Sequence, residues 1–190
     1  MKNNKTYPKV YSLPKGFINE GVLNYFEASF FASILHSSST VVRKEVFDKV
    51  GLYNPSIKSG QDTELYIRMG LHYSVVFSNR ICSRYYILKN SLFRSSTSLA
   101  EKADFSSYEA LAKTNPSFKK FLDLNAFSHA IFAKSIRDED GFSEKIKHIN
   151  MSNLSNKQRF LLRQSSTSIR ILYAVKRFLE RFEIHLSAFR

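Results

Sequence analysis

The sequence predicts an α/β fold, in which a partial mixed sheet with flanking helices is followed by a mainly helical C-terminal subdomain. Short strand-like runs alternate with helical patterns in residues 1–95, whereas the pattern beyond the polar stretch 95–98 is helical to the end. The chain has 190 residues, of which 43% are hydrophobic, enough for one core with a helical appendage. We therefore place an α/β region at 1–95 and a helical extension at 96–190.

The first predicted element is a helix that begins at Asn19 and Glu20. Leu23, Phe26 and Phe30 fall on one side of it. The next element is a strand at about 38–42, where serine and threonine are followed by two valines.

Three further elements follow from local signals. A short helix begins at Lys44 and ends at Gly51, because glycine is the usual residue just beyond a helix C-terminus. Two apolar runs, at 74–77 and 81–88, are rich in β-branched and aromatic residues and predict strands.

A helix between the 44–51 helix and the 74–77 strand begins near Asp62 and runs to about His72. Gly60 permits a tight turn before it, and Asp62 or Thr63 can cap its first turn. A carboxylate at this position lies at the positive end of the helix dipole, which favours its ionised form. An ionised Asp62 could accept a proton from a bound hydroxyl group, or it could serve only as a helix cap.

The helical extension carries two clear helix starts. Asn115 and Pro116 supply a capping side chain and a proline at the first helical position. Ser155 and Gln158 have the spacing of a capping box.

The last predicted helix spans 169–182 and is cationic and amphipathic. It carries an apolar stripe and a set of arginines on another side: Leu172, Val175, Leu179 and Phe182, then Arg170, Arg177 and Arg181. The stripe could pack on the protein's own core or bind an anionic membrane surface, and the sequence leaves both open.

Five segments occur in a familiar order between His36 and Arg94. They are Ser37–Phe47, Val50–Pro55, Gly60–Asp62, Leu65–Met69 and Tyr73–Val76. In this order they resemble the acceptor side of family-two glycosyltransferases of the GT-A type: a serine-rich strand, a Gly-Leu-Tyr turn, and a Gly-Glu-Asp motif that opens a helix leading to a strand.

The resemblance implies a partial GT-A-like sheet and an inverting transfer of a sugar from a nucleotide-sugar donor to a hydroxyl acceptor. Asp62 matches the general base of the family. Gln61, which stands where the family has glutamate, and Ser38 would line the acceptor site. The acceptor would be a sugar or a lipid-linked glycan in polysaccharide or glycoconjugate synthesis.

The resemblance also implies that the donor-binding half lies outside this chain. That half would bind the nucleotide sugar and a divalent cation, Mg²⁺ or Mn²⁺, so we expect no metal bound by this chain alone and little activity without it. The only Asp-x-Asp, at 138–140, follows Asp62 and lacks a preceding strand, so we expect a solvated turn there and no metal site.

The formal net charge of +13 indicates partners that carry phosphates or other anions. Nucleic acid is disfavoured, because the basic residues are dispersed and no nucleic-acid-binding motif accompanies them. A rival hypothesis is a non-catalytic protein that binds anionic glycans or membrane surfaces. The single cysteine is compatible with a reducing cytoplasm, and we expect a cytoplasmic protein. A lipid-linked acceptor would place it peripherally at the inner face of the membrane.

Overall fold

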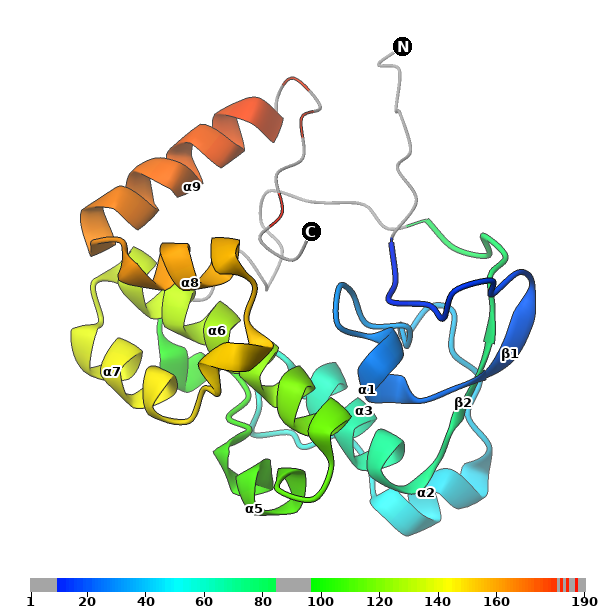
Figure 1. Ribbon diagram of the computed structural model, residues 1–190. Helices are drawn as coiled ribbons and strands as arrows, with labels where there is room; N and C mark the ends of the chain where they lie inside the picture. The colour runs from blue at the N-terminus through cyan, green and yellow to red at the C-terminus, as the bar shows by residue number, and fades with distance from the viewer. Residues whose placement is uncertain (1–9, 85–96, 181, 183, 185–186, 188–190) are drawn as a thin grey trace.

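The computed structural model describes residues 10–84, 97–180, 182, 184 and 187. A long helix, α6 (Pro116–Ile136), crosses the middle of the molecule (Figure 1). The N-terminal strands and helices lie on one side of α6, and the C-terminal helices lie on the other. The chain is therefore a mixed α/β structure with a helical C-terminal part, as the sequence predicts.

Within its described residues, the N-terminal part contains one small sheet and three helices. Its elements are β1 (Glu20–Leu23), α1 (Tyr25–Ala28), α2 (Lys44–Val50), α3 (Gln61–His72) and β2 (Val75–Ser78). The two strands are antiparallel, with Val22 opposite Val76. The positions of α2, α3 and β2 confirm the predictions for these three elements.

The C-terminal part is helical throughout its described residues. Besides α6 it contains α5 (Glu109–Ala112), α7 (Glu139–Lys147), α8 (Asn156–Arg163), α9 (Ser166–Glu180) and three short 3₁₀ helices, η1 (Leu99–Glu101), η2 (Ser106–Tyr108) and η3 (Met151–Asn153). Both predicted helix starts are confirmed: the Asn115 side chain accepts the N–H of Phe118 at 3.0 Å, and Ser155 and Gln158 form a reciprocal capping box. No helix in the described ranges has the length and apolar character needed to cross a membrane.

Two predicted elements near the N-terminus are wrong. Residues 20–23 form a strand, because Asn24 caps the N–H groups of Phe26 and Glu27 and so starts the helix only at Tyr25. Residues 38–42 do not form a strand. Thr40 folds this segment into a turn, since its hydroxyl donates to the carbonyl of His36 at 2.8 Å and accepts the N–H of His36 at 3.0 Å.

The strand predicted at 81–88 is also absent from its described part. Residues 81–84 are irregular and exposed, and 85–88 lie outside the described residues. The apolar pattern alone does not produce a strand here, because Ile81 is almost fully exposed and so lacks the packing that would hold it in a sheet.

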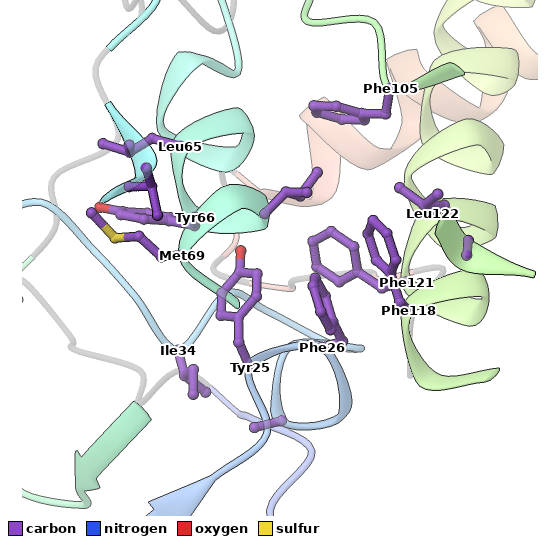
Figure 2. Packing of buried hydrophobic residues seen from close by; sticks show 14 of the residues in the cluster. Tyr25, Phe26, Ile34, Leu65, Tyr66, Met69, Phe105, Phe118, Phe121 and Leu122 are labelled. Atoms are coloured by element: carbon purple, nitrogen blue, oxygen red, sulfur yellow. The ribbon is translucent and has the colours of Figure 1, made fainter. Parts of the chain in front are cut away.

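The hydrophobic core has two parts, and α6 contributes to both. The N-terminal core includes Tyr25, Phe26, Leu65, Ile67, Phe105, Phe118, Phe121 and Leu122, and Figure 2 shows the rings of Phe118 and Phe121 against Phe26. The C-terminal core consists of Leu124, Phe127, Ala130, Ile131, Ile149, Leu154, Leu162 and Ile169. The N-terminal core thus takes residues from both sides of position 95.

A second contact across the chain fixes the turn that precedes α3. The N–H of Ser59 donates to the carbonyl of Glu101 at 2.9 Å, and the N–H of Ala103 donates to the carbonyl of Ser59 at 2.8 Å. Gly60 follows with φ of +89°, and a Cβ atom on it would lie 3.2 Å from the Cβ of Ala103. Glycine at this position therefore satisfies both the left-handed backbone and the close approach of the 101–103 segment.

Substitution of Gly60 by alanine is expected to lower the free energy of unfolding by about 2 kcal/mol, from backbone strain and crowding of Ala103. Gly16 is the matched control, because its φ is +82° but a Cβ atom on it would have no neighbouring atom within 4 Å. Gly16→Ala should lower the free energy of unfolding by only about 1 kcal/mol, because only the backbone strain applies there. Urea denaturation measures both variants, and equal losses would contradict the contact with Ala103.

Candidate functional site

Asp62 is exposed at the start of α3. Gly60 is the N-cap residue, so Asp62 is the second residue of the helix, and its Oδ1 accepts the N–H of Thr63 at 2.7 Å. The carboxylate therefore lies at the positive end of the helix dipole, as the sequence predicts, and remains accessible to a ligand from solvent.

Of the two predicted acceptor-binding residues, one belongs to α3 and the other to the 36–40 turn. Gln61 is the first residue of α3 and is half-buried. Ser38 is exposed in the 36–40 turn, where its N–H donates to Nδ1 of His36 at 3.3 Å. The residue of this turn that contacts α3 is its neighbour Ser37, whose Oγ lies 3.3 Å from the hydroxyl of Tyr66.

Tyr66 links the 36–40 turn to the start of α3. Its hydroxyl contacts Ser37 of the turn, and its position in α3 is one helical turn after Asp62. Burial raises the pKa of the Tyr66 phenol; the hydrogen bond with Ser37 acts in the opposite direction, and Tyr53 and the Asp62 carboxylate raise the pKa further. The phenol is therefore protonated at neutral pH and can donate a hydrogen bond. Sequence reasoning missed both Tyr66 and Ser37, although the spacing of four residues from Asp62 to Tyr66 was a usable signal.

Tyr25 lies behind Tyr66 in the N-terminal core (Figure 2), with ring centroids 6.3 Å apart. It is fully buried, and its hydroxyl lies 3.4 Å from Oγ of Ser33. Burial raises the pKa of the Tyr25 phenol far above its ordinary value, and the charge of Asp62 adds to this effect. A layer of protonated phenols thus underlies the exposed carboxylate.

An ion pair on α3 holds the helix in place one turn beyond Asp62. Oε1 of Glu64 accepts Nε of Arg68 at 2.8 Å, and Oε2 accepts Nη2 at 2.7 Å, so the pair is bidentate. The Tyr108 hydroxyl donates to Oε1 of Glu64 at 2.8 Å. Arg68 also donates to the carbonyls of Val50 and Leu52.

This network connects three parts of the chain: the end of α2, the first turns of α3 and the segment before α5. It also positions the turn at 51–53, from which Tyr53 interacts with Tyr66. Burial acts to raise the pKa of Glu64, but the hydrogen bonds from Arg68 and Tyr108 and the charge of Arg68 outweigh burial and lower it. Burial and the bond to Glu64 raise the pKa of Tyr108 to about 12.

The Asp-x-Asp segment is engaged in helix capping. Oδ1 of Asp138 accepts the N–H of Gly141 at 2.8 Å, which caps α7, and Oε1 of Glu139 accepts the hydroxyl of Ser166 at 2.6 Å. The segment begins a helix, so the solvated turn expected there is limited to its first residue. Among the described residues, no group of three or more His, Cys, Asp or Glu side chains could hold a metal ion.

Two surface hollows lie away from Asp62. One, of about 420 Å³, is lined by Lys119, His148 and Asn150, among others. The other, of about 430 Å³, contains His129, whose pKa is lowered to about 4 by burial and by the charges of Lys102 and Lys145. His129 is therefore neutral at physiological pH.

Comparison with protein families, with curated proteins and with solved structures found no match to this chain. The candidate site is therefore defined by the geometry around Asp62. An exposed carboxylate at a helix N-terminus, beside buried neutral hydroxyl groups, can accept a hydrogen bond and then a proton from a hydroxyl ligand.

Glu64→Gln is expected to lower the free energy of unfolding at pH 7 by about 2 kcal/mol, because it removes a charge-assisted pair that is largely buried. The folded-state pKa of Glu64 is lowered, so this stabilisation is complete above the ordinary value of 4.5 and is lost as pH falls through the lower folded-state value. The difference between wild type and variant should therefore shrink below about pH 4.5.

Glu45→Gln is the matched control, since the ion pair of Glu45 with Arg43 is exposed and 3.8 Å long. It should change the free energy of unfolding by less than about 1 kcal/mol. Chemical denaturation between pH 3 and 8 measures all three proteins. A Glu64→Gln effect that is constant over this range would contradict the charge-assisted role of Glu64.

Proposed function

We propose that the chain forms the acceptor side of an inverting, nucleotide-sugar-dependent glycosyltransferase of the GT-A type, with Asp62 as the general base. The observation that carries the proposal is the exposed Asp62 carboxylate at the N-terminus of α3, with the 36–40 turn packed on the same helix. The order of the segments from Ser37 to Val76, which resembles that family, supports the same assignment.

The reaction assigned to this site is a single displacement. The acceptor hydroxyl donates a hydrogen bond to the Asp62 carboxylate, which takes the proton as the hydroxyl oxygen bonds to the anomeric carbon of the donor sugar. The bond from that carbon to the nucleoside diphosphate breaks, and the diphosphate leaves with the electron pair. Attack from the opposite face inverts the anomeric configuration.

Gln61 and Ser38 are assigned to acceptor binding. The Gln61 amide can donate to and accept from sugar hydroxyl groups, and its place at the first position of α3 puts it next to Asp62. The exposed Ser38 hydroxyl belongs to the turn that Ser37 and Tyr66 hold against α3. Tyr66 is a positioning residue in this scheme, because it acts on the acceptor site through the turn.

The proposal concerns the acceptor side of the reaction. For the donor we expect a nucleotide-binding half, which enzymes of the family that the sequence resembles carry before the acceptor half. A divalent cation on that half would neutralise the leaving diphosphate. The rival proposal, a non-catalytic protein for anionic glycans, would share the acceptor site but would not need a base at position 62.

Asp62→Asn should reduce sugar transfer by about 10²–10⁴-fold, the usual contribution of a general base, because the amide cannot take the proton. The assay combines this chain with the nucleotide-binding half of a family-two glycosyltransferase and a panel of nucleotide sugars and saccharide acceptors. Circular dichroism should show unchanged folding.

Asp48→Asn is the matched control, since Asp48 is an exposed carboxylate on the neighbouring helix α2. It should leave transfer unchanged. Transfer that persists in Asp62→Asn would remove Asp62 from the mechanism. If the chain binds a saccharide acceptor but transfers no sugar to it from any of the nucleotide sugars, the non-catalytic glycan-binding proposal would be favoured.

A further inference from the structure

Among the described residues, helix α9 packs on the C-terminal core through one face. Ile169 is 2% exposed in the C-terminal core, and Tyr173, one turn further along, packs against the same core. Burial at this contact raises the pKa of the Tyr173 phenol. The inner face of α9 is therefore defined by Ile169 and Tyr173.

The opposite face of α9 is apolar and exposed. We call it the outer ridge, and it consists of Ile171, Val175 and Phe178, which are 58%, 44% and 55% exposed. Their spacing of four and three residues places them on one side of α9, about half a turn from Ile169 and Tyr173. Phe182, two residues beyond the end of α9, is 62% exposed and extends this surface. The rings of Phe178 and Phe182 are 5.1 Å apart, so the end of the ridge is a continuous aromatic surface.

The stripe predicted from the sequence largely coincides with this exposed surface. Leu172, Val175 and Phe182 are exposed, and Leu179 is half-buried. Arg181, the third predicted arginine of the helix, lies outside the described residues. Figure 1 shows α9 along the outer side of the C-terminal part, and the exposure of the ridge side chains shows that they do not pack on the core formed by the described residues.

The charges beside the outer ridge are all positive. At 100° per residue, Arg170 and Arg177 lie on one side of the ridge, between it and the inner face, and Lys176 lies at a similar angle on the other side. From residue 156 to 179 the sequence has six Lys or Arg and no Asp or Glu, and the one acidic residue of α9 is its last residue, Glu180. An occupant of this surface must therefore be apolar along its middle and anionic at its edges.

We propose that the outer ridge of α9 binds the surface of an anionic lipid bilayer. Ile171, Val175 and Phe178 would enter the boundary between headgroups and acyl chains, and Arg170 and Arg177 would contact the lipid phosphates. A second copy of this chain fits less well, because two such helices would bring rows of like charge together. The inference does not depend on the proposed transferase activity.

Binding through one short ridge is reversible and sensitive to salt. The expected partner of the intact chain is a vesicle of phosphatidylcholine with phosphatidylglycerol, and pure phosphatidylcholine vesicles should bind far less. Surface attachment of this kind would also keep the chain next to a lipid-linked acceptor.

Co-sedimentation with vesicles of these two compositions tests the inference on the full chain. The double variant Ile171→Ser/Phe178→Ser should lower the affinity for anionic vesicles about 10-fold or more, because two exposed apolar side chains are removed. Val22→Ser/Val76→Ser is the matched control, since it removes an exposed apolar pair from the β1–β2 sheet and should leave binding unchanged.

A second double variant, Arg170→Gln/Arg177→Gln, tests the contribution of charge. It should lower the affinity for anionic vesicles about 30-fold, which is the effect of two basic residues near an anionic surface. Its control, Arg80→Gln/Arg84→Gln, lowers the net charge by the same two units at exposed sites outside α9 and should change binding much less. Equal losses in variant and control would overturn the proposal. Unchanged vesicle binding by Ile171→Ser/Phe178→Ser would also overturn it. A third contradicting result would be a dimer of the wild-type chain in analytical ultracentrifugation that becomes a monomer in this variant.

Discussion

The bidentate ion pair between Glu64 and Arg68 is the interaction on which the position of α3 depends. It is largely buried, and its two partners reach the carbonyls of Val50 and Leu52 and the hydroxyl of Tyr108. A buried charge is costly unless it is paired and hydrogen-bonded, so each member of this network requires the others. The consequence is that the first turns of α3 cannot move independently of α2 or of the segment before α5.

The start of α3 is restrained a second time by the hydrogen bonds between Ser59 and the 101–103 segment. Helix α6 then joins the two parts of the core, since its first half packs on Phe26 and its second half on the C-terminal helices. On α6, the buried Asp123 accepts hydrogen bonds from Lys119, Asn150 and Asn153, which fixes the 150–153 segment beside the helix. The exposed Asp62 is thus supported by contacts from both halves of the chain, which is the rigidity that the proposed proton-accepting role would need.

The sequence predicted those elements whose ends are set by local capping. Gly51, Asn115 and the Ser155–Gln158 box mark helix ends through contacts within a few residues, and the corresponding helices are present. It failed at 20–23 and 38–42, where cross-strand pairing and the Thr40 hydroxyl decided the backbone. At the site it predicted the helix-start position of Asp62, but not the contact of Ser37 with Tyr66 across 29 residues or of Glu64 with Tyr108 across 44. Such pairs carry no local pattern, because only the packed core brings them together.

The central claim is that a saccharide acceptor binds at the start of α3. It is tested most directly by titrating the isotope-labelled chain with a panel of neutral and anionic oligosaccharides while its backbone amide resonances are followed by NMR. The account predicts saturable shifts in the 36–40 turn and at Gln61, Asp62 and Thr63, and these shifts should not require a donor. Shifts confined to the hollows at Lys119 or His129, or no saturable shifts at the start of α3, would contradict it.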